Sequence, residues 1–121
     1  MNRRVRHQRR YIARFLHLVV HACHELGVKT VAVTAGYIYP EPRAELYAKI
    51  DAANVDLKAF TDEFYWKTCA AHLEPVKDTL RYLVHETSVW TEITTLIIPG
   101  LNDSDRERGS PSRRARGRVH L

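Results

Sequence analysis

Cysteine is scarce in this chain, and its placement suits neither a disulfide nor a metal site. The 121 residues include two cysteines, Cys23 and Cys69, which lie 46 positions apart. Neither has a second metal ligand at a typical spacing, and no pairing pattern is evident. Free cysteine usually behaves as a small buried apolar side chain, so we expect both in the core and neither as a catalytic nucleophile.

Long apolar runs are also absent. The longest candidate, Phe15–Val20, is interrupted by His17, whereas about 20 apolar residues are needed to cross a bilayer. The first ten residues are basic but lack the clear apolar region and cleavage site of a secretory signal. With 45% hydrophobic residues, the chain has enough apolar material for the core of one globular domain. We expect a soluble, cytoplasmic protein that does not associate with a membrane.

Positive charge is concentrated at the two ends. Residues 15–104 include seven basic and twelve acidic residues, whereas the rest of the chain has twelve arginines, no lysine and two acidic residues. Beyond Ser104 there is no aromatic residue and no periodic apolar face, so this segment cannot bury enough surface to offset its chain entropy. We predict a basic N-terminal segment at 1–10, which could extend the first helix, a folded unit at 11–104 and a disordered arginine-rich tail at 105–121.

Apolar periodicity predicts alternating helices and strands. The first helix has apolar residues three and four positions apart and ends at Gly27, where a left-handed cap is favoured. The run Thr30–Gly36 is apolar at nearly every position, which is typical of a parallel strand covered on both faces. The apolar face of the first helix comprises Ile12, Leu16, Val19, Cys23 and Leu26.

The remaining patterns complete an α/β fold. Connections between the strands are long enough for right-handed crossovers, so we predict a parallel sheet, as either a barrel segment or an open doubly wound sheet. The second and third strands are expected at 54–60 and 89–98, with helices from about Pro42 to Ala52, from Thr61, and from Glu74 to about His85.

Asp56 and Lys58 form the sharpest candidate site. Residues two apart in a strand point to the same face, with Leu57 opposite, so these two side chains lie together near a strand end. A carboxylate and an ammonium placed there are costly to bury without a partner. The pair could hold a zwitterion such as an amino acid, with Asp56 on its ammonium and Lys58 on its carboxylate. An internal salt bridge at a barrel rim is the alternative.

Other polar residues lie at the ends of the first and third strands, the edge where α/β sheets bind ligands. Thr34 and Gly36 could approach a polar ligand, or could be a strand end followed by a turn glycine. Asn102 and Asp103 follow Pro99–Gly100 and could border a ligand, or could be ordinary turn residues.

Two further patterns carry alternative functions. His17 and His21 share a helix face that could bind a metal, but no acidic third ligand accompanies them, so we favour a solvated helix face. The arginines at both ends could neutralise phosphate in a small nucleic-acid-binding module, although the tail has no aromatic residue to stack on bases.

Four segments in sequence order resemble the middle of a radical SAM enzyme, and above all the group related to pyruvate formate-lyase-activating enzyme and, within it, the radical SAM member of the AmmeMemoRadiSam system. The resemblance spans roughly residues 21–105. The segments are VAVTAGYIYPEPR, DAANVDLKAFTDEFY, HLEPVKDTLRYL and EITTLIIPGLNDSD.

The resemblance implies a partial (β/α)6 barrel, here as three consecutive β/α units, that binds S-adenosylmethionine and a [4Fe–4S] cluster. In this family the reduced cluster cleaves the cofactor to a 5′-deoxyadenosyl radical, which takes hydrogen from a substrate protein or small molecule. The resemblance places Asp56 and Lys58 at the methionine end of the cofactor, Thr34 and Gly36 near its ribose and methionine, and Asn102 and Asp103 beside its nucleoside.

The departures from the family are as informative as the matches. The CxxxCxxC loop that holds the cluster is absent from these 121 residues, and three thiolates are needed to hold it. We therefore expect a truncated radical SAM domain that is inactive alone, with arginine-rich ends read out of frame. Its open sheet edges should make it unstable or aggregation-prone, unless another polypeptide supplies the missing strands.

Overall fold

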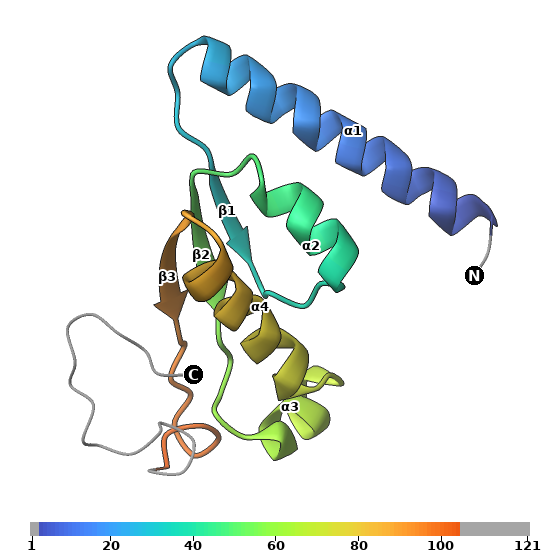
Figure 1. Cartoon of the computed structure of the whole chain (residues 1–121). Coiled ribbons are helices and arrows are strands. Elements are labelled where there is room, and N and C mark those ends of the chain that lie inside the picture. Colours follow the sequence, from blue (N-terminus) through green and yellow to red (C-terminus); the bar gives the residue numbers. More distant parts are fainter. Residues whose placement is uncertain (1–2, 105–121) are drawn as a thin grey trace.

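The computed structural model describes residues 3–104, with side chains described from residue 14 onward. Helices and strands follow one another in the predicted order (Figure 1). The elements are α1 (Arg3–Glu25), β1 (Val31–Thr34), α2 (Pro40–Tyr47), β2 (Ala52–Asp56), α3 (Asp62–Cys69), α4 (Leu73–Glu86) and β3 (Trp90–Thr94).

The three strands form one parallel sheet in the order β1-β2-β3. Val55 in the central strand pairs with Thr34 on one side and with Ile93 on the other, so all three strands end at the same edge. A parallel neighbour requires a crossover connection, and helices provide it on both sides of β2. The predicted α/β class with three parallel β/α units is confirmed.

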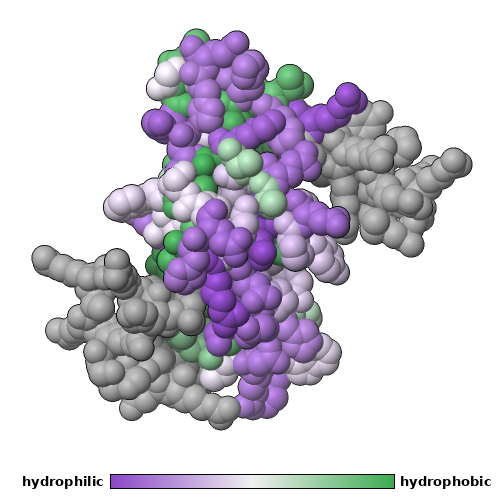
Figure 2. Space-filling model, viewed as in Figure 1, coloured by the Kyte–Doolittle hydropathy of each residue, from purple (hydrophilic) through white to green (hydrophobic). Residues whose placement is uncertain are grey.

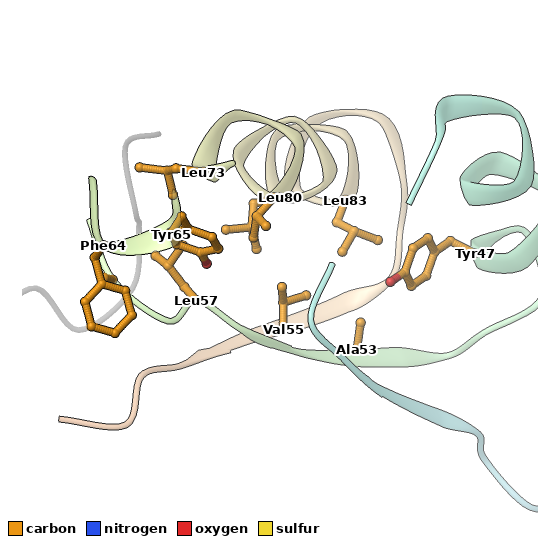
Figure 3. Close-up of a cluster of buried hydrophobic side chains, with 11 residues drawn as sticks. Tyr47, Ala53, Val55, Leu57, Phe64, Tyr65, Leu73, Leu80 and Leu83 are labelled. Atoms are coloured by element: carbon orange, nitrogen blue, oxygen red, sulfur yellow. The ribbon is translucent and has the colours of Figure 1, made fainter. Parts of the chain in front are cut away.

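The core lies on one face of the sheet, between β2 and the helices. Ala53 and Val55 alternate with more exposed residues along β2, and their side chains face Leu80 and Leu83 of α4 (Figure 3). Tyr47 at the end of α2 closes the same cluster. Seen from the helix side, the outer surface over α3 and α4 is mostly hydrophilic (Figure 2), as expected for amphipathic helices.

The opposite face of the sheet, which we call the open face, is not covered by any described element. Val33 in β1 is 82% exposed and Trp90 in β3 is 71% exposed. The prediction that β1 is covered on both faces was therefore wrong, because α2 and α4 pack on the same side. The strand residues on the open face are Val31, Val33, Ala52, Asn54, Asp56, Trp90, Glu92 and Thr94.

Helix α1 begins at Arg3 and has 23 residues, so the basic N-terminal segment extends the first helix, which was one of the possibilities left open by the sequence. Its predicted apolar face is not buried, since Leu16 and Val19 are exposed and Val20 is the buried apolar residue. The side of α1 that meets the rest of the chain instead carries His17, which faces Glu45 of α2, and His24, which faces Asp51 before β2.

Several element boundaries also differ from the prediction. Helix α2 ends at Tyr47 rather than near Ala52. Strand β2 spans Ala52–Asp56 rather than 54–60, and β3 ends at Thr94 rather than at Ile98. The backbone N–H groups of Asp51 and Ala52 both donate to the carbonyl of Thr30, which joins them to β1. The disorder predicted for 105–121 lies outside the described residues. Within the described part of the chain, no helix is both long and apolar enough to span a bilayer.

Candidate functional site

Asp56 and Lys58 lie together on the open face at the carboxyl end of β2. The alternation of burial continues beyond the strand, so Leu57 is buried in the core while its two neighbours are partly exposed. Lys58 Nζ forms an ion pair with Asp56 Oδ2, which confirms that the two side chains share a face. Asp56 Oδ1 is shielded from solvent and accepts no hydrogen bond. The pair therefore has an unused acceptor beside an ammonium group.

The peptide group of Lys58 is held from both sides. Its N–H donates to the hydroxyl of Tyr65 at 2.9 Å, and its carbonyl accepts from Asn102 Nδ2 at 2.8 Å. Burial raises the pKa of Tyr65, while the hydrogen bond from the Lys58 amide opposes that rise. Tyr65 is therefore a neutral acceptor at physiological pH. Sequence reasoning missed it, although it closes the DLKAFTDEFY segment in which the site was recognised.

Asn102 is fully buried and uses its whole amide group within the chain. Its Oδ1 accepts the N–H of Ile98 at 2.6 Å, and its Nδ2 donates to the carbonyls of Leu96 and Lys58, both at 2.8 Å. It thus ties the segment after β3 to the segment after β2. This is the turn role left open by the sequence, and the next residue, Asp103, is half-buried.

Thr34 and Gly36 lie at the same sheet edge as Asp56 but on the other face. Thr34 pairs in register with Val55, which points into the core, and its hydroxyl oxygen accepts the N–H of Gly36 at 3.1 Å. Gly36 has a φ of +69°, and a Cβ there would meet Val55 Cγ1 at 2.9 Å. Both residues shape the turn after β1, and the structure does not bring them together with the Asp56–Lys58 pair.

A polar row continues the site along the open face. Thr94 Oγ1 donates to Asn54 Oδ1 at 3.0 Å, and Asn54 Nδ2 is 3.5 Å from Glu92 Oε2. Thr94 is the register partner of Asp56. The carboxylates of Asp56 and Glu92 therefore lie on the same face of the sheet, and Lys58 pairs with Asp56 there, which favours a ligand with a positively charged group.

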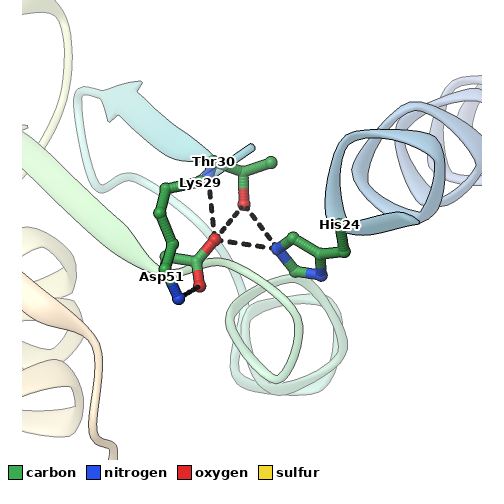
Figure 4. A network of polar contacts seen from close by, with 4 residues as sticks. All are labelled: His24, Lys29, Thr30 and Asp51. Atoms are coloured by element: carbon green, nitrogen blue, oxygen red, sulfur yellow. Dashed lines mark hydrogen bonds and ion pairs between the residues drawn. The ribbon is translucent and has the colours of Figure 1, made fainter. Parts of the chain in front are cut away.

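A second polar cluster lies at the opposite edge of the sheet, where the strands begin (Figure 4). Asp51 accepts hydrogen bonds from the amide and hydroxyl of Thr30 at 2.8 and 3.0 Å, and from Lys29 at 3.2 Å. His24 Nε2 of α1 is 2.8 Å from the same carboxylate. The backbone N–H of Thr30, then the bond to His24, holds the pKa of Asp51 well below its usual range. This cluster fastens α1 to the sheet.

The cysteines do not form a cluster site. Cys23 is half-buried in α1 and Cys69 is exposed at the end of α3, so the expectation that both are buried was wrong for Cys69. Among residues whose side chains are described, no group of three or more His, Cys, Asp or Glu could hold a metal ion. Two thiols on separate helices do not fit a [4Fe–4S] cluster. The unused acceptor of Asp56 and the ammonium of Lys58 do fit the charged groups of an amino acid.

Comparisons with known proteins concern first the sequence and then the fold. No family model matches the chain. The uncharacterized protein MJ0808 of Methanocaldococcus jannaschii is 44% identical over 80 residues, which cover 66% of this chain. The chain spans only 23% of the length of that relative.

The fold is similar to that of solved structures, one of which is an enzyme domain. A domain of pyruvate-formate lyase-activating enzyme from Bacteroides vulgatus superposes with a TM-score of 0.69, at 19% sequence identity, over 80% of this chain and 60% of that one. At this identity the likeness concerns the fold. The three parallel β/α units thus have the fold of a domain from the enzyme group that the four sequence motifs resemble.

Proposed function

We propose that this chain is part of a radical SAM protein and forms the wall that binds the amino acid end of S-adenosylmethionine. Asp56 accepts hydrogen bonds from the ammonium group of the ligand, and Lys58 pairs with its carboxylate. The observation that carries the proposal is the Asp56–Lys58 pair on the open face, with Asp56 Oδ1 lacking a donor. A buried acceptor without a partner costs free energy, which a ligand donor would recover.

The backbone contacts explain how the pair would stay in place. The bonds from Lys58 to Tyr65 and Asn102 fix the main chain, so only the lysine side chain has to move when a ligand enters. Lys58 Nζ then leaves Asp56 for the ligand carboxylate, and the ligand ammonium replaces it. The exchange preserves one ion pair for each charge, and this limits the desolvation cost of binding.

Radical generation is not assigned to these 121 residues. When bound, the cluster supplies the electron that cleaves S-adenosylmethionine, and Cys23 and Cys69 do not fit it. We expect no 5′-deoxyadenosine from the purified chain under reducing conditions. Formation of 5′-deoxyadenosine in stoichiometric amounts would show that the chain holds a cluster without the three cysteines of a CxxxCxxC loop.

Ligand binding can be measured by isothermal titration calorimetry on the full chain. S-adenosylmethionine should bind more tightly than 5′-methylthioadenosine, which shares the nucleoside but lacks the amino acid. Asp56→Asn and Lys58→Met should each weaken S-adenosylmethionine binding about tenfold and leave 5′-methylthioadenosine unchanged. Lys67→Met is the matched control, because it removes one lysine from an exposed ion pair with Glu63 on α3. Equal affinity for the two ligands in the unsubstituted chain would contradict the proposal.

Nucleic acid binding is the second candidate, and the extent of α1 favours it. Helix α1 begins at Arg3 and includes six arginines up to Arg14, so the basic N-terminal residues belong to one helix. Arginines on a helix can neutralise a row of phosphates, with an affinity that falls steeply with salt. A gel shift with duplex RNA or DNA that persists at about 0.15 M salt would support this function. No shift at that ionic strength would reject it.

A further inference from the structure

A small cavity lies on the helix side of the sheet, away from the open face. It is formed where the segment after β1 meets the first turns of α2 and α4, and its volume is about 240 Å³. Cofactor and drug pockets are usually about 300–1,000 Å³, so this one suits a single large side chain. It is lined mainly by Tyr37, Tyr39, Pro40, Arg43, Pro75 and Asp78.

Arg43 is a cation without an anion in the wall of this cavity. Its guanidinium carbon lies 4.5 Å from the centre of the Tyr82 ring, which fixes the group by a cation–π contact. Its Nε is shielded from solvent and has no acceptor. No described carboxylate forms an ion pair with Arg43. Asp78, across the cavity, pairs with Arg81 instead, with 2.8 Å between Arg81 Nη1 and Asp78 Oδ1.

The aromatic wall is open to solvent. Tyr37 and Tyr39 are both exposed, and the prolines at positions 40 and 75 add rigid apolar rings beside them. Tyrosine and arginine are the residue types that most often anchor protein partners, because they combine large area with a fixed polar group. A rigid arginine fork also matches the two oxygens of a carboxylate.

We propose that this cavity is an anchor for a partner polypeptide, which inserts one aromatic side chain and places a neighbouring carboxylate on Arg43. Charge complementarity selects an acidic partner, because Asp78 and Glu74 are both paired with Arg81 and Arg43 is left unpaired. The size of the cavity selects one aromatic ring. The site is independent of the open face and of S-adenosylmethionine.

Two blocked dipeptides test this directly by NMR titration of the ¹⁵N-labelled full chain. N-acetyl-Trp-Glu-amide should cause saturable shifts in the amide signals of Tyr39 and Arg43. N-acetyl-Trp-Gln-amide has the same ring without the charge, and should bind about fivefold more weakly. Equal affinity of the two peptides, an absence of saturable shifts, or shifts confined to residues around Asp56 would overturn the proposal.

Two variants and a control separate binding from folding. Tyr39→Ser removes one ring but leaves a favourable N-cap for α2, where Tyr39 makes no side-chain capping bond, so the helix should persist while peptide binding falls. Arg43→Gln should abolish the preference for the Glu peptide. Lys77→Gln removes a positive charge from α4 outside this cavity, and should retain the preference. If Arg43→Gln still prefers the Glu peptide over the Gln peptide, a group other than Arg43 binds the carboxylate of the peptide.

Discussion

Gly36 and Gly27 both have a left-handed backbone, but only one of them has close neighbours. Their φ angles are +69° and +71°. A Cβ at Gly36 would lie 2.9 Å from Val55 Cγ1 and 3.4 Å from Val76 Cγ1, whereas a Cβ at Gly27 would meet nothing within 4 Å. The two positions therefore separate backbone strain from steric exclusion.

We predict that Gly36→Ala destabilises the chain by about 2 kcal/mol more than Gly27→Ala. Both variants carry the left-handed cost of a non-glycine residue, about 1–2 kcal/mol, and only the first also crowds the core. Urea denaturation followed by circular dichroism measures both free energies of unfolding. Val55→Ala added to Gly36→Ala should recover part of the loss, and equal effects of the two single substitutions would contradict the steric argument.

The site residues show where sequence reasoning stops. Alternation along β2 is a local property, so the shared face of Asp56 and Lys58 followed from spacing alone. The role of Asn102 did not, because its partners at Leu96 and Lys58 lie 6 and 44 positions away. A turn sequence such as PGLND does not indicate whether its asparagine contacts a ligand or forms hydrogen bonds with the main chain of neighbouring segments.

At the scale of elements, strand ends depended on their neighbours. Burial continues to alternate through residues 57–60 as predicted, yet β2 ends at Asp56, where its pairing with β1 has ended at Thr34 and its pairing with β3 ends at Thr94. The apolar patterns predicted each described helix and strand, but they did not predict the residue at which each strand stops pairing with its neighbour. Long-range pairing, which no local pattern contains, sets that boundary.

Helix α1 depends on one carboxylate for its attachment. Asp51 precedes β2, receives bonds from Lys29 and Thr30 before β1, and faces His24 in α1. Its carbonyl also accepts the N–H of Trp90 at the start of β3. One residue thus connects a helix with the first residues of all three strands.

We predict that Asp51 makes the stability of the fold depend on acidity. Its pKa is lowered in the folded chain, chiefly by the Thr30 amide, so the unfolded chain takes up the proton first as the pH falls. The stabilisation is complete above the ordinary carboxyl pKa of about 4 and declines below it. Unfolding of the unsubstituted chain and of Asp51→Asn by urea at a series of pH values measures this.

The Asp51→Asn variant should be less stable at neutral pH and lose less stability on acidification. Glu41→Gln, on the exposed first turn of α2, is the control for the loss of one negative charge. If the two stability curves run parallel across the pH series, the pKa of Asp51 does not differ between the folded and the unfolded chain, and the prediction is wrong.

At the scale of the whole molecule, the uncovered open face is the dominant feature. Val31, Val33 and Trp90 expose large apolar side chains on it, and Phe15 and Leu18 do so on α1. Strands β1 and β3 each have one edge without a described neighbour. Apolar surface next to unpaired strand edges is typical of a surface that another polypeptide covers.

We predict that the purified chain associates through this face, and that a charge placed on it weakens the association. Val33→Lys puts an ammonium on an exposed edge strand, the device by which natural sheets avoid edge pairing. Loss of one buried valine side chain should raise the dissociation constant about tenfold in sedimentation velocity on dilution. Ala44→Lys, which adds the same charge at an exposed position on α2, should associate like the unsubstituted chain.

If both lysine variants dissociate equally, net charge controls the assembly. If neither changes it, the contact lies on α1, where Phe15→Lys would then be the variant that separates the copies.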